Sequence, residues 1–484
     1  MLSDEIAGIR PSERPLLSVL IPLYNEETFV AECLARVLDA PFPEGASFEI
    51  IVVDDGSTDD SVSSVLGMQT KHGGTIRLIR HDRNRGKGAA IRTAIEHACG
   101  DFCIIQDADL EYSPTDYPKL LKPLLDGDAD AVFGSRFAFT GERRVLYFWH
   151  AVANRILTLI CDMVADVNLT DVHTCYKVMR TSLLKGIPIR NDRFGIDPEL
   201  TIKLAQRHAR IYETSISYHG RTYEEGKKIG LKDAFQALWI IIHFGLLKRD
   251  VYKDRSAEIL DTLAGAPRFN RWMADTLRPF LGDHVMEVGA GIGNLSAQLC
   301  RRRKCYIASD RNPEYMARLS ARLKHHPAVR LISADLESSE DFAPYERQLD
   351  SVLCLNVLEH INEDRAALSN LFRVLRPGGK AVILVPEGMR AYGTLDEVLG
   401  HYRRYSEEEL SSKVRAAGFQ LETLIRFNRP TRPAWFLNGR ILKRRTISRF
   451  EIFFFDRLVW LWRKIDSLLP WKPASIIAVG VRPS

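Results

Sequence analysis

The sequence predicts an α/β protein built from two doubly wound domains. Two apolar strand-like runs, residues 16–24 and residues 284–291, each lead into a loop rich in Gly, Asp or Asn. After each of them, strand-like runs alternate with helical patterns, which is typical of parallel sheets with crossover helices. The length of 484 residues also favours two or three domains, at about 150 residues per domain.

The charged stretch 248–255 lies between the two halves and is the expected linker. We therefore place the domains at residues 1–250 and 251–484. Hydrophobic residues make up 45% and charged residues 27% of the chain, a balance that excludes a disordered, collagen-like or coiled-coil protein. The formal net charge of +5 is too small to imply a protein that coats a polyanion.

The eight cysteines are scattered and form neither a CxxC pair nor a zinc-finger spacing with histidines. Reduced thiols in a cytoplasmic protein are therefore expected. Residues 1–15 are polar and lack the apolar stretch of a signal peptide. The longest apolar run, 237–247, is interrupted by His243. A membrane span needs about 20 apolar residues, so no transmembrane helix is predicted.

Acidic residues follow two predicted strands of the first half. The strand 48–53 ends in Asp54 and Asp55. Carboxylates at this end of a parallel strand point into the ligand crevice, where they can accept hydrogen bonds from a ribose hydroxyl or a base NH. A helix N-cap would explain Ser57 or Thr58, but it would not explain two adjacent aspartates.

The strand 102–106 leads into three acids at alternating positions, Asp107, Asp109 and Glu111. This spacing gathers oxygen ligands on one side, which suits Mg²⁺ or Mn²⁺ with a nucleotide diphosphate completing the shell. A bound ion would stabilise the charge of the leaving group. The alternative is an ordinary acidic pair on the surface.

These motifs, with others further along, resemble those of family 2 glycosyltransferases of GT-A fold. The branch is the one similar to dolichyl-phosphate mannose or glucose synthases, and the resemblance spans about 230 residues. The motifs are Pro22–Glu26, Asp54–Asp59, Arg85–Gly88, Asp107–Leu110, Gly134–Arg136, Thr170–Asp171, Phe194–Glu199 and Gly220–Lys228.

The resemblance implies an inverting hexosyltransferase that moves a sugar from a UDP- or GDP-linked donor to a polyprenyl phosphate. It assigns the donor to five residues: Pro22, Glu26, Asp54, Asp55 and Lys87. It assigns the metal and catalytic roles to Asp107 and Asp109, with Glu111 as a third metal ligand. Related enzymes often carry Gln at the position of Glu111.

A phosphate acceptor is already anionic at neutral pH and needs cations more than a base. Arg136 and Arg221, which we also count as catalytic, and Lys227 with Lys228 meet this need. One of the two lysines is expected to be a solvated surface residue. The run 173–177 departs from the Gly-Phe-Lys of many relatives, so a sugar hydroxyl or a different lipid stays open as the acceptor.

In the second half, a strand beginning at His284 leads into a loop with glycines at every second position. These are Gly289, Gly291 and Gly293, which let the backbone turn sharply and approach a ligand. The spacing G-x-G-x-G followed by Asn294 weighs against a dinucleotide site. Two further strands end in Asp310 and Asp335, where carboxylates can bind a ribose diol and an adenine amino group.

With the runs 349–360 and 375–385, these residues resemble a class I S-adenosylmethionine-dependent methyltransferase of Rossmann-like fold. The match covers residues 265 to 430. The resemblance implies a cofactor held by Glu287 and the glycine loop at its methionine part, by Asp310 at the ribose, by Asp335 at the adenine and by Asn356 at the pocket floor.

Methyl transfer chiefly requires alignment, so no strong acid or base is obligatory. His360 and His401 are the candidate bases, because histidine titrates near neutrality. The alternatives are a packed His360 and a solvated His401. After the run 400–405, Ser406–Glu409 forms a capping box, and a helix is expected to start at Leu410.

The predicted last two strands, 419–427 and 474–481, are separated by the 46 residues 428–473. This basic insertion holds eleven Lys/Arg and three Asp/Glu, giving +8, so the rest of the chain is −3. It also holds Phe453–Phe455 and four of the seven tryptophans: Trp435, Trp460, Trp462 and Trp471. Aromatic rings among basic residues suit an anionic bilayer surface. The alternatives are a helical cap over the methyltransferase pocket and a nucleic-acid surface, which lacks a recognised binding module.

Together these observations predict a bifunctional transferase, cytoplasmic and peripheral at the inner membrane face, with no nucleic-acid partner. Leu231–Leu247 is a second candidate for membrane contact, or else a core helix. The methyl acceptor is expected to be a glycan or lipid-linked product of the same pathway. Two alternatives stay open: a glycosyltransferase acting on a soluble or cell-envelope glycan hydroxyl beside an independent methyltransferase, and a membrane-attached scaffold with inactive sites.

Overall fold

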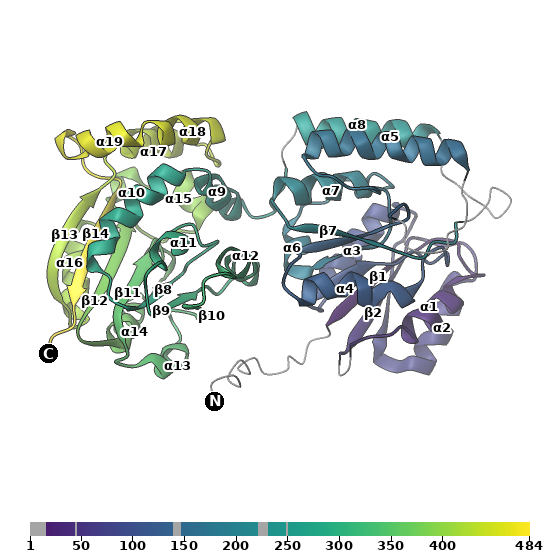
Figure 1. Cartoon of the computed structure of the whole chain (residues 1–484), viewed down its shortest axis with the longest axis horizontal. Helices are drawn as coiled ribbons and strands as arrows, with labels where there is room; N and C mark the ends of the chain where they lie inside the picture. Colours follow the sequence, from purple (N-terminus) through teal and green to yellow (C-terminus); the bar gives the residue numbers. More distant parts are fainter. Residues whose placement is uncertain (1–15, 44–45, 139–146, 221–230, 248–249) are drawn as a thin grey trace. The chain divides into compact units, whose positions relative to one another are not determined.

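A computed structural model describes residues 16–43, 46–138, 147–220, 231–247 and 250–484 (Figure 1). The chain divides into two compact units, Met1–Lys253 and Asp254–Ser484. We call them the N-terminal and the C-terminal domain. Arg221, Lys227 and Lys228, which sequence analysis assigns to the acceptor phosphate, lie outside the described residues.

The N-terminal domain has a seven-stranded mixed sheet in the order β3-β2-β1-β4-β6-β5-β7. All strands run parallel except β6, which is antiparallel to β4 and β5. Parallel strands are covered on both faces, and β1 and β2 accordingly consist almost entirely of buried apolar residues. The strands are β1 (Leu17–Leu23), β2 (Phe48–Asp54), β3 (Ile76–Arg80), β4 (Phe102–Ile105), β5 (Ala131–Ser135), β6 (Lys177–Arg180) and β7 (Ile211–Ser215).

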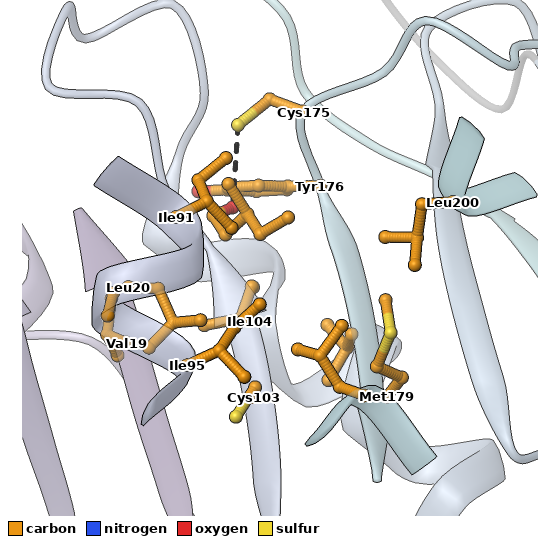
Figure 2. Packing of buried hydrophobic residues seen from close by; sticks show 14 of the residues in the cluster. Val19, Leu20, Ile91, Ile95, Cys103, Ile104, Cys175, Tyr176, Met179 and Leu200 are labelled. Carbon is orange, nitrogen blue, oxygen red and sulfur yellow. Dashed lines mark hydrogen bonds between the residues drawn. The ribbon is translucent and has the colours of Figure 1, made fainter. Parts of the chain in front are cut away.

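Helices cover both faces of this sheet (Figure 1). The core lies between the sheet and helices such as α3, whose Ile91 and Ile95 pack towards β1 and β4 (Figure 2). The helices are α1 (Val30–Leu38), α2 (Ser61–His72), α3 (Lys87–His97), α4 (Tyr117–Leu125), α5 (Phe148–Ala165), α6 (Thr181–Gly186), α7 (Ile196–Gln206) and α8 (Leu231–Ile242). Helices α5 and α8 pack side by side, and α8 continues into a π-helical turn at His243–Leu247.

The C-terminal domain has a second seven-stranded sheet in the order β10-β9-β8-β11-β12-β14-β13. Here only β14 is antiparallel to the rest. The predicted α/β fold class with two wound sheets is therefore confirmed, with one reversed strand in each sheet. The strands are β8 (His284–Val288), β9 (Cys305–Ser309), β10 (Val329–Ile332), β11 (Leu349–Leu355), β12 (Leu375–Pro386), β13 (Gln420–Phe427) and β14 (Ser475–Val481).

The helices of the C-terminal domain include three that belong to the basic insertion. Outside it lie α9 (Arg255–Ala264), α10 (Pro267–Leu277), α11 (Ser296–Leu299), α12 (Pro313–Leu323), α13 (Ser339–Phe342), α14 (Asp364–Val374), α15 (Thr394–Leu399) and α16 (Glu407–Ala416). Helix α16 starts three residues earlier than expected, although Ser406 Oγ does accept the Glu409 amide at 3.1 Å. The insertion forms α17 (Thr431–Phe436), α18 (Arg449–Arg457) and α19 (Val459–Ile465).

All eight cysteines are free thiols, and six of them are buried. In the described parts of the chain, no helix combines the length and the apolar character needed to cross a bilayer.

Candidate active sites

Asp55, at the carboxyl end of β2, organises the loop that leads into α3. Its Oδ1 lies 2.7 Å from Nδ1 of His81 and accepts the Arg85 amide at 2.9 Å, while its Oδ2 accepts the Gly86 amide at 2.6 Å. A Cβ on Gly86, where φ is +102°, would lie 2.3 Å from the Asp192 carbonyl oxygen, so this turn requires glycine. Asp55 therefore shapes the crevice by holding its wall.

Asp54 has one carboxylate oxygen that accepts no hydrogen bond from the described residues. The side chain is fully buried, and its Oδ1 accepts the Ser57 amide at 3.1 Å. Its Oδ2 accepts no hydrogen bond from the described residues and has only the Nε of Arg80 nearby, at 3.6 Å. A buried carboxylate oxygen without a hydrogen bond is costly, and a sugar or base hydroxyl or NH would satisfy it.

Pro22 and Glu26 mark the end of β1. Pro22 pairs in register with Val53 of β2, so it belongs to the sheet itself. The loop that follows is tied to the start of α2, because the Glu26 amide donates to Ser61 Oγ at 2.9 Å. Glu26 therefore follows the carboxyl end of β1, and Asp54 and Asp55 lie at the carboxyl end of the neighbouring strand β2.

The acidic pair Asp107 and Asp109 follows β4 in the same edge of the sheet. Both carboxylates act on the buried thiol of Cys33, so they share one neighbourhood. The Nζ of Lys87, at the start of α3, lies 2.6 Å from Asp107 Oδ1. Burial is the largest single effect and opposes the charge of Lys87, but the attractions of Asp107, Cys175 and Asp197 and the hydrogen bond to Asp107 together raise its pKa. Leu110 adopts a left-handed φ of +60°, which is a strained conformation for a bulky residue and is typical of functional turns.

Glu111 is less available to a metal than the pair before it. Its Oε2 accepts a hydrogen bond of 2.9 Å from the hydroxyl of Tyr218. This contact links the acidic loop to residues following β7, and the two segments are also joined by a bridge between Tyr112 and Tyr218.

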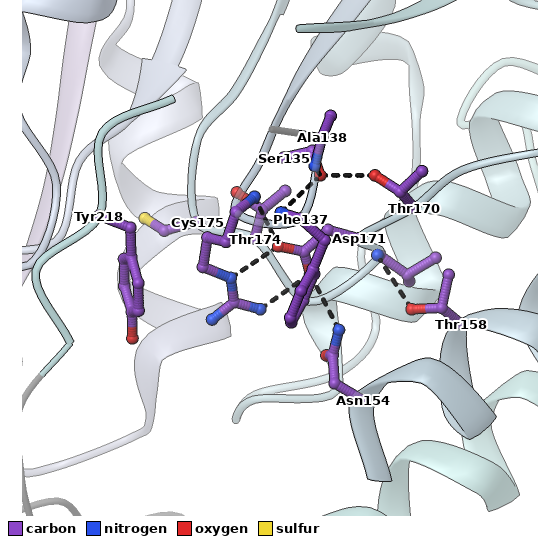
Figure 3. A network of polar contacts seen from close by, with 12 residues as sticks. Ser135, Phe137, Ala138, Asn154, Thr158, Thr170, Asp171, Thr174, Cys175 and Tyr218 are labelled. Atoms are coloured by element: carbon purple, nitrogen blue, oxygen red, sulfur yellow. Dashed lines mark hydrogen bonds and ion pairs between the residues drawn. The ribbon is translucent and has the colours of Figure 1, made fainter. Parts of the chain in front are cut away.

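Arg136 follows β5 and is held by a carboxylate that sequence analysis did not assign. Asp171 accepts from its Nε at 2.6 Å and from its Nη2 at 2.8 Å, and Asn154 donates to the same carboxylate at 3.3 Å (Figure 3). The guanidinium carbon also lies 5.2 Å from the ring centre of Tyr218. Burial opposes the negative charge of Asp171, but the Arg136 guanidinium keeps the pKa of Asp171 below its usual value. Asp171 therefore fixes Arg136 near the acidic loop.

A second buried ion pair involves the run 173–177, whose sequence differs from the Gly-Phe-Lys of many relatives. Lys177 is fully buried and its Nζ lies 2.7 Å from Asp197 Oδ1 at the start of α7. Lys177 and Lys87 both lower the pKa of Asp197, so this aspartate connects the ion pair with Lys87. This network was not predicted, because a lysine on an apolar strand gives no local signal of the carboxylate that it contacts.

In the C-terminal domain, the glycine loop follows β8 with all three glycines in left-handed conformations, at φ of +69°, +56° and +78°. A Cβ on Gly289 would lie 2.3 Å from Val357 Cγ2, so glycine is required there. The Gly291 amide donates to Asp310 Oδ2 at 2.9 Å, which joins the ends of β8 and β9. Burial raises the pKa of Asp310.

The remaining predicted cofactor residues differ in burial. Glu287 is buried within β8, where Ser296 and Tyr306 donate to its Oε2, and burial raises its pKa to about 7. Asp335 follows β10 with a half-exposed side chain. Asn356 follows β11, is exposed and has a left-handed φ of +54°. Asp310, Asp335 and Asn356 thus follow the carboxyl ends of β9, β10 and β11, at the same end of the sheet as the glycine loop. Glu287 lies inside β8, below that loop in the strand.

His401, a predicted candidate base, is buried, so the alternative of a solvated loop residue is wrong. Its Nδ1 lies 2.9 Å from Asp396 Oδ1, and its ring packs edge-on against His360 with ring centres 4.7 Å apart. Asp396 also accepts from Arg404 Nε at 2.7 Å. Glu359 is fully buried beside them, and burial raises its pKa to about 8. Neither Asp396 nor Glu359 was a predicted site residue.

Two surfaces expose apolar side chains. On the α5–α8 face, the exposed residues are Phe148, Trp149, Ile156, Leu159, Met163, Phe235, Trp239, Leu246 and Leu247, with Trp149 77% exposed. On the basic insertion, Phe450, Phe453, Phe454 and Trp460 are exposed. Phe455 packs on Phe269 of α10, and Trp462 stacks on Phe455. The insertion is therefore a docked cap that also has an apolar outer face.

Comparison with known proteins agrees with both sheets. The model of the family described as glycosyl transferase family 2 matches residues 18–187, and that described as methyltransferase domain matches residues 286–383. The N-terminal half is 26% identical over 267 residues to dodecaprenyl-phosphate galacturonate synthase of Rhizobium johnstonii, covering 54% of this chain and 76% of that protein.

Two further relatives have the same kind of name. Undecaprenyl-phosphate 4-deoxy-4-formamido-L-arabinose transferase of Pseudomonas aeruginosa is 30% identical over 219 residues, 45% of this chain and 62% of its own length. Dolichol-phosphate mannosyltransferase of Pyrococcus furiosus is 26% identical over 225 residues, 46% of this chain and 61% of its own length. The chain thus spans about three-fifths of the length of these two proteins.

The two sheets and their motifs define a transferase with two different domains. The chain belongs to the family 2 glycosyltransferases through its N-terminal domain, and its C-terminal domain is a class I methyltransferase domain. A methyltransferase domain implies S-adenosylmethionine as the methyl donor.

Proposed function

We propose that the N-terminal domain transfers a hexose from a UDP- or GDP-linked donor to a polyprenyl phosphate, with inversion at the sugar carbon. The observation that carries this proposal is the likeness to three proteins named for polyprenyl- or dolichol-phosphate substrates. The acidic pair after β4 and the nearby Arg136 support it, because they supply carboxylates and a fixed cation at one sheet edge.

Asp107 and Asp109 fit a Mg²⁺ or Mn²⁺ ion, because two carboxylates in one loop are hard oxygen ligands. Glu111 would be a weaker third ligand, since Tyr218 already occupies one of its oxygens. Such an ion would neutralise charge on the departing diphosphate. Lys87 holds Asp107 in place and adds a second positive charge beside it.

The acceptor phosphate needs positioning but no base, because its attacking oxygen already carries negative charge. That oxygen forms the new bond to the sugar carbon as the bond to the nucleoside diphosphate breaks. Arg136, held by Asp171, presents a fixed guanidinium for the phosphate. Arg221, Lys227 and Lys228 complete the proposed acceptor site from outside the described residues. Asp54 and Glu26 bind the donor, in a crevice shaped by Pro22 and Asp55.

For the C-terminal domain, we propose methyl transfer from S-adenosylmethionine to a glycan or lipid-linked product of the same pathway. Gly291 and Asp310 place the cofactor, with Asp335 and Asn356 at either side. The coupling of the two reactions is supported only by their fusion in one chain. Methylation assays with and without glycosylated products test it, and a methyltransferase that ignores every such product contradicts it.

An alanine substitution in the glycine loop tests the cofactor site. Gly289→Ala is expected to weaken S-adenosylmethionine binding by roughly tenfold or more, because φ is +69° and the new Cβ would meet Val357. Gly378→Ala is the matched control, since its φ is +76° but no atom lies within 4 Å of its Cβ position. Calorimetric titration measures both affinities, and equal losses would contradict the proposed loop contact.

We further propose that the chain binds the inner membrane face as a peripheral protein. Exposed apolar patches mark interaction surfaces, and here the α5–α8 face carries two tryptophans that would lie at headgroup depth. The basic insertion adds an apolar face among arginines and lysines. A soluble or cell-envelope glycan acceptor beside an independent methyltransferase remains the second candidate, because the run 173–177 departs from relatives.

The double variant Trp149→Ser/Trp239→Ser is expected to weaken binding to anionic vesicles at least tenfold, since each ring removed forfeits about 1.5–3 kcal/mol of burial. Both side chains are largely exposed, so the melting temperature should stay unchanged. Leu66→Ser on α2 is the control, being an exposed apolar residue outside the face. Co-sedimentation measures the binding, and an undiminished double variant would contradict the membrane face.

Release of UDP or GDP tests the sugar-transfer proposal. With Mn²⁺ and a panel of nucleotide sugars, one donor should release nucleotide faster when polyprenyl-phosphate vesicles are added. Equal release with a soluble glycan acceptor would favour the second candidate. No release from any donor would favour a membrane-attached scaffold with inactive sites.

A further inference from the structure

Three potential metal ligands meet in the C-terminal domain. Glu359 and His360 lie in the short helix Leu358–His360 after β11, and His401 lies in the loop after α15. One ligand atom of each lies within 4.8 Å of the other two. The Nε2 of His401 is 4.0 Å from Glu359 Oε1. The fold therefore brings together two imidazoles and one carboxylate from segments about forty residues apart.

The buried carboxyl group of Glu359 has no hydrogen-bond partner among the described residues. The side chain is 0% exposed, and neither of its carboxylate oxygens has a hydrogen-bond partner among the described residues. Removing a carboxylate from water without a partner costs several kcal/mol. Buried charges are therefore paired or coordinate a metal. The Nε2 of His401, at 4.0 Å, is too far away to donate a hydrogen bond.

His401 is oriented to offer its Nε2 as a ligand. Asp396 accepts hydrogen bonds from Arg404 Nε at 2.7 Å and from the Gly393 amide at 3.0 Å, which favours its ionised form. The His401 Nδ1, 2.9 Å away, therefore carries the proton that Asp396 accepts. The Nε2 lone pair then faces Glu359. A carboxylate that fixes the outer nitrogen of a histidine in this way is typical of metal centres.

We propose that Glu359, His360 and His401 bind one divalent transition-metal ion, with Zn²⁺ as the reference ion. Two imidazoles and a carboxylate are a common ligand set that leaves coordination positions open. Ligands at about 2.1 Å from a shared ion lie roughly 3–4 Å apart. The separations here, none above 4.8 Å, need a contraction of at most about 1.4 Å to reach the roughly 3.4 Å of a tetrahedral site.

The position of this cluster indicates which substrate group would bind at an open coordination position of the ion. Glu359 follows Asn356 by three residues, at the edge of the sheet where the glycine loop and Asp310 lie. If the proposed methyl transfer holds, on which this step rests, the ion binds a hydroxyl oxygen of the acceptor. The hydroxyl proton leaves to solvent, the oxygen forms a bond to the methyl carbon, and the carbon–sulfur bond breaks to leave a neutral thioether. His401 is then a ligand instead of a base.

Metal binding is measured on the full chain after treatment with a chelator. Equilibrium dialysis against micromolar Zn²⁺ should load one more equivalent on the wild type than on His360→Gln/His401→Gln. Co²⁺ should give the wild type a visible absorption band that this variant lacks. His72→Gln/His325→Gln is the matched control, since both histidines are exposed and outside the cluster. Asp109→Asn removes a carboxylate of the other domain and should keep the band.

Glu359→Gln keeps the shape of the side chain and should also lose the band, while Zn²⁺ should raise the melting temperature of the wild type alone. Equal Zn²⁺ content and equal melting shifts in the wild type and both cluster variants would overturn the site. The outcome is separable from the proposed function. A chain that binds S-adenosylmethionine but no Zn²⁺ contradicts the metal site only, and a chain that binds Zn²⁺ but no S-adenosylmethionine contradicts the methyl-transfer proposal only.

Discussion

Replacing Asp109 by alanine should lower the rate of sugar transfer by on the order of 10²–10³-fold, or about 3–4 kcal/mol of transition-state stabilisation. The reason is that Asp109 supplies half of the acidic pair after β4, and Lys87 is already paired with the other half. With one carboxylate gone, the remaining loop offers too few hard ligands for the ion that would neutralise the leaving diphosphate. Initial rates of nucleotide release measure the effect.

The same variant should leave methyl transfer to a supplied glycosylated acceptor untouched, because the methyltransferase domain is built from a separate sheet. Asp126→Ala is the matched control, since this aspartate lies on the surface, where it forms an exposed ion pair with Lys122 of α4. Equal turnover in wild type, Asp109→Ala and Asp126→Ala would show that the acidic pair has no catalytic role.

Asp171→Ala is expected to have the largest effect on stability, a loss of about 3–5 kcal/mol in the unfolding free energy of the N-terminal domain. The Asp171 side chain is fully buried and takes both bonds of the mostly buried Arg136. Its removal leaves the guanidinium in the interior without its carboxylate. Urea unfolding, with hydrogen exchange to assign each transition to a domain, measures the change.

The double variant Arg136→Met/Asp171→Leu separates stability from function. A buried ion pair replaced by apolar residues of similar size is often neutral or stabilising. The double variant should therefore recover most of the lost stability while losing sugar transfer, because the guanidinium that Asp171 holds for the acceptor phosphate is gone. Recovery of transfer together with stability would contradict the proposed role of Arg136.

The sequence predicts well which residues lie at the carboxyl ends of the strands, because this depends on local patterns. Apolar runs bounded by acids or glycines identify β2, β4, β8 and β9, and the ends of neighbouring parallel strands must meet. This places Gly291 beside Asp310 without knowledge of the packing. The strained turns at Gly289 and Gly293 are likewise visible as glycines.

What the sequence could not predict are contacts between residues far apart in the chain. Asp171 lies 35 residues from Arg136, and nothing in either motif specifies their pairing. His401 has a loop sequence and yet is buried, because Asp396 and Arg404 pack around it. Asp55 appears as a ligand residue by position, whereas its oxygens are used by the loop after β3.

The basic insertion shows why composition alone could not distinguish a bilayer-binding surface from a helical cap. Its aromatic residues divide between an inner face, where Phe455 and Trp462 meet α10, and an outer face that carries Phe453 and Trp460. Helical spacing sets which side chain points inward, and charge counts carry no such information. The Nε1 of Trp435 even donates to Asp396 at 3.2 Å, so the cap reaches the methyltransferase site.

The most direct test of the central claim is mass spectrometry of the lipid product. The full chain is incubated with polyprenyl-phosphate vesicles, Mn²⁺, each UDP- and GDP-sugar in turn, and S-adenosylmethionine. The account predicts that with one donor the polyprenyl phosphate gains the mass of a sugar, and that Asp109→Ala forms none of this product. Sugar appearing only on a soluble glycan, or lipid product forming equally in Asp109→Ala, would contradict it.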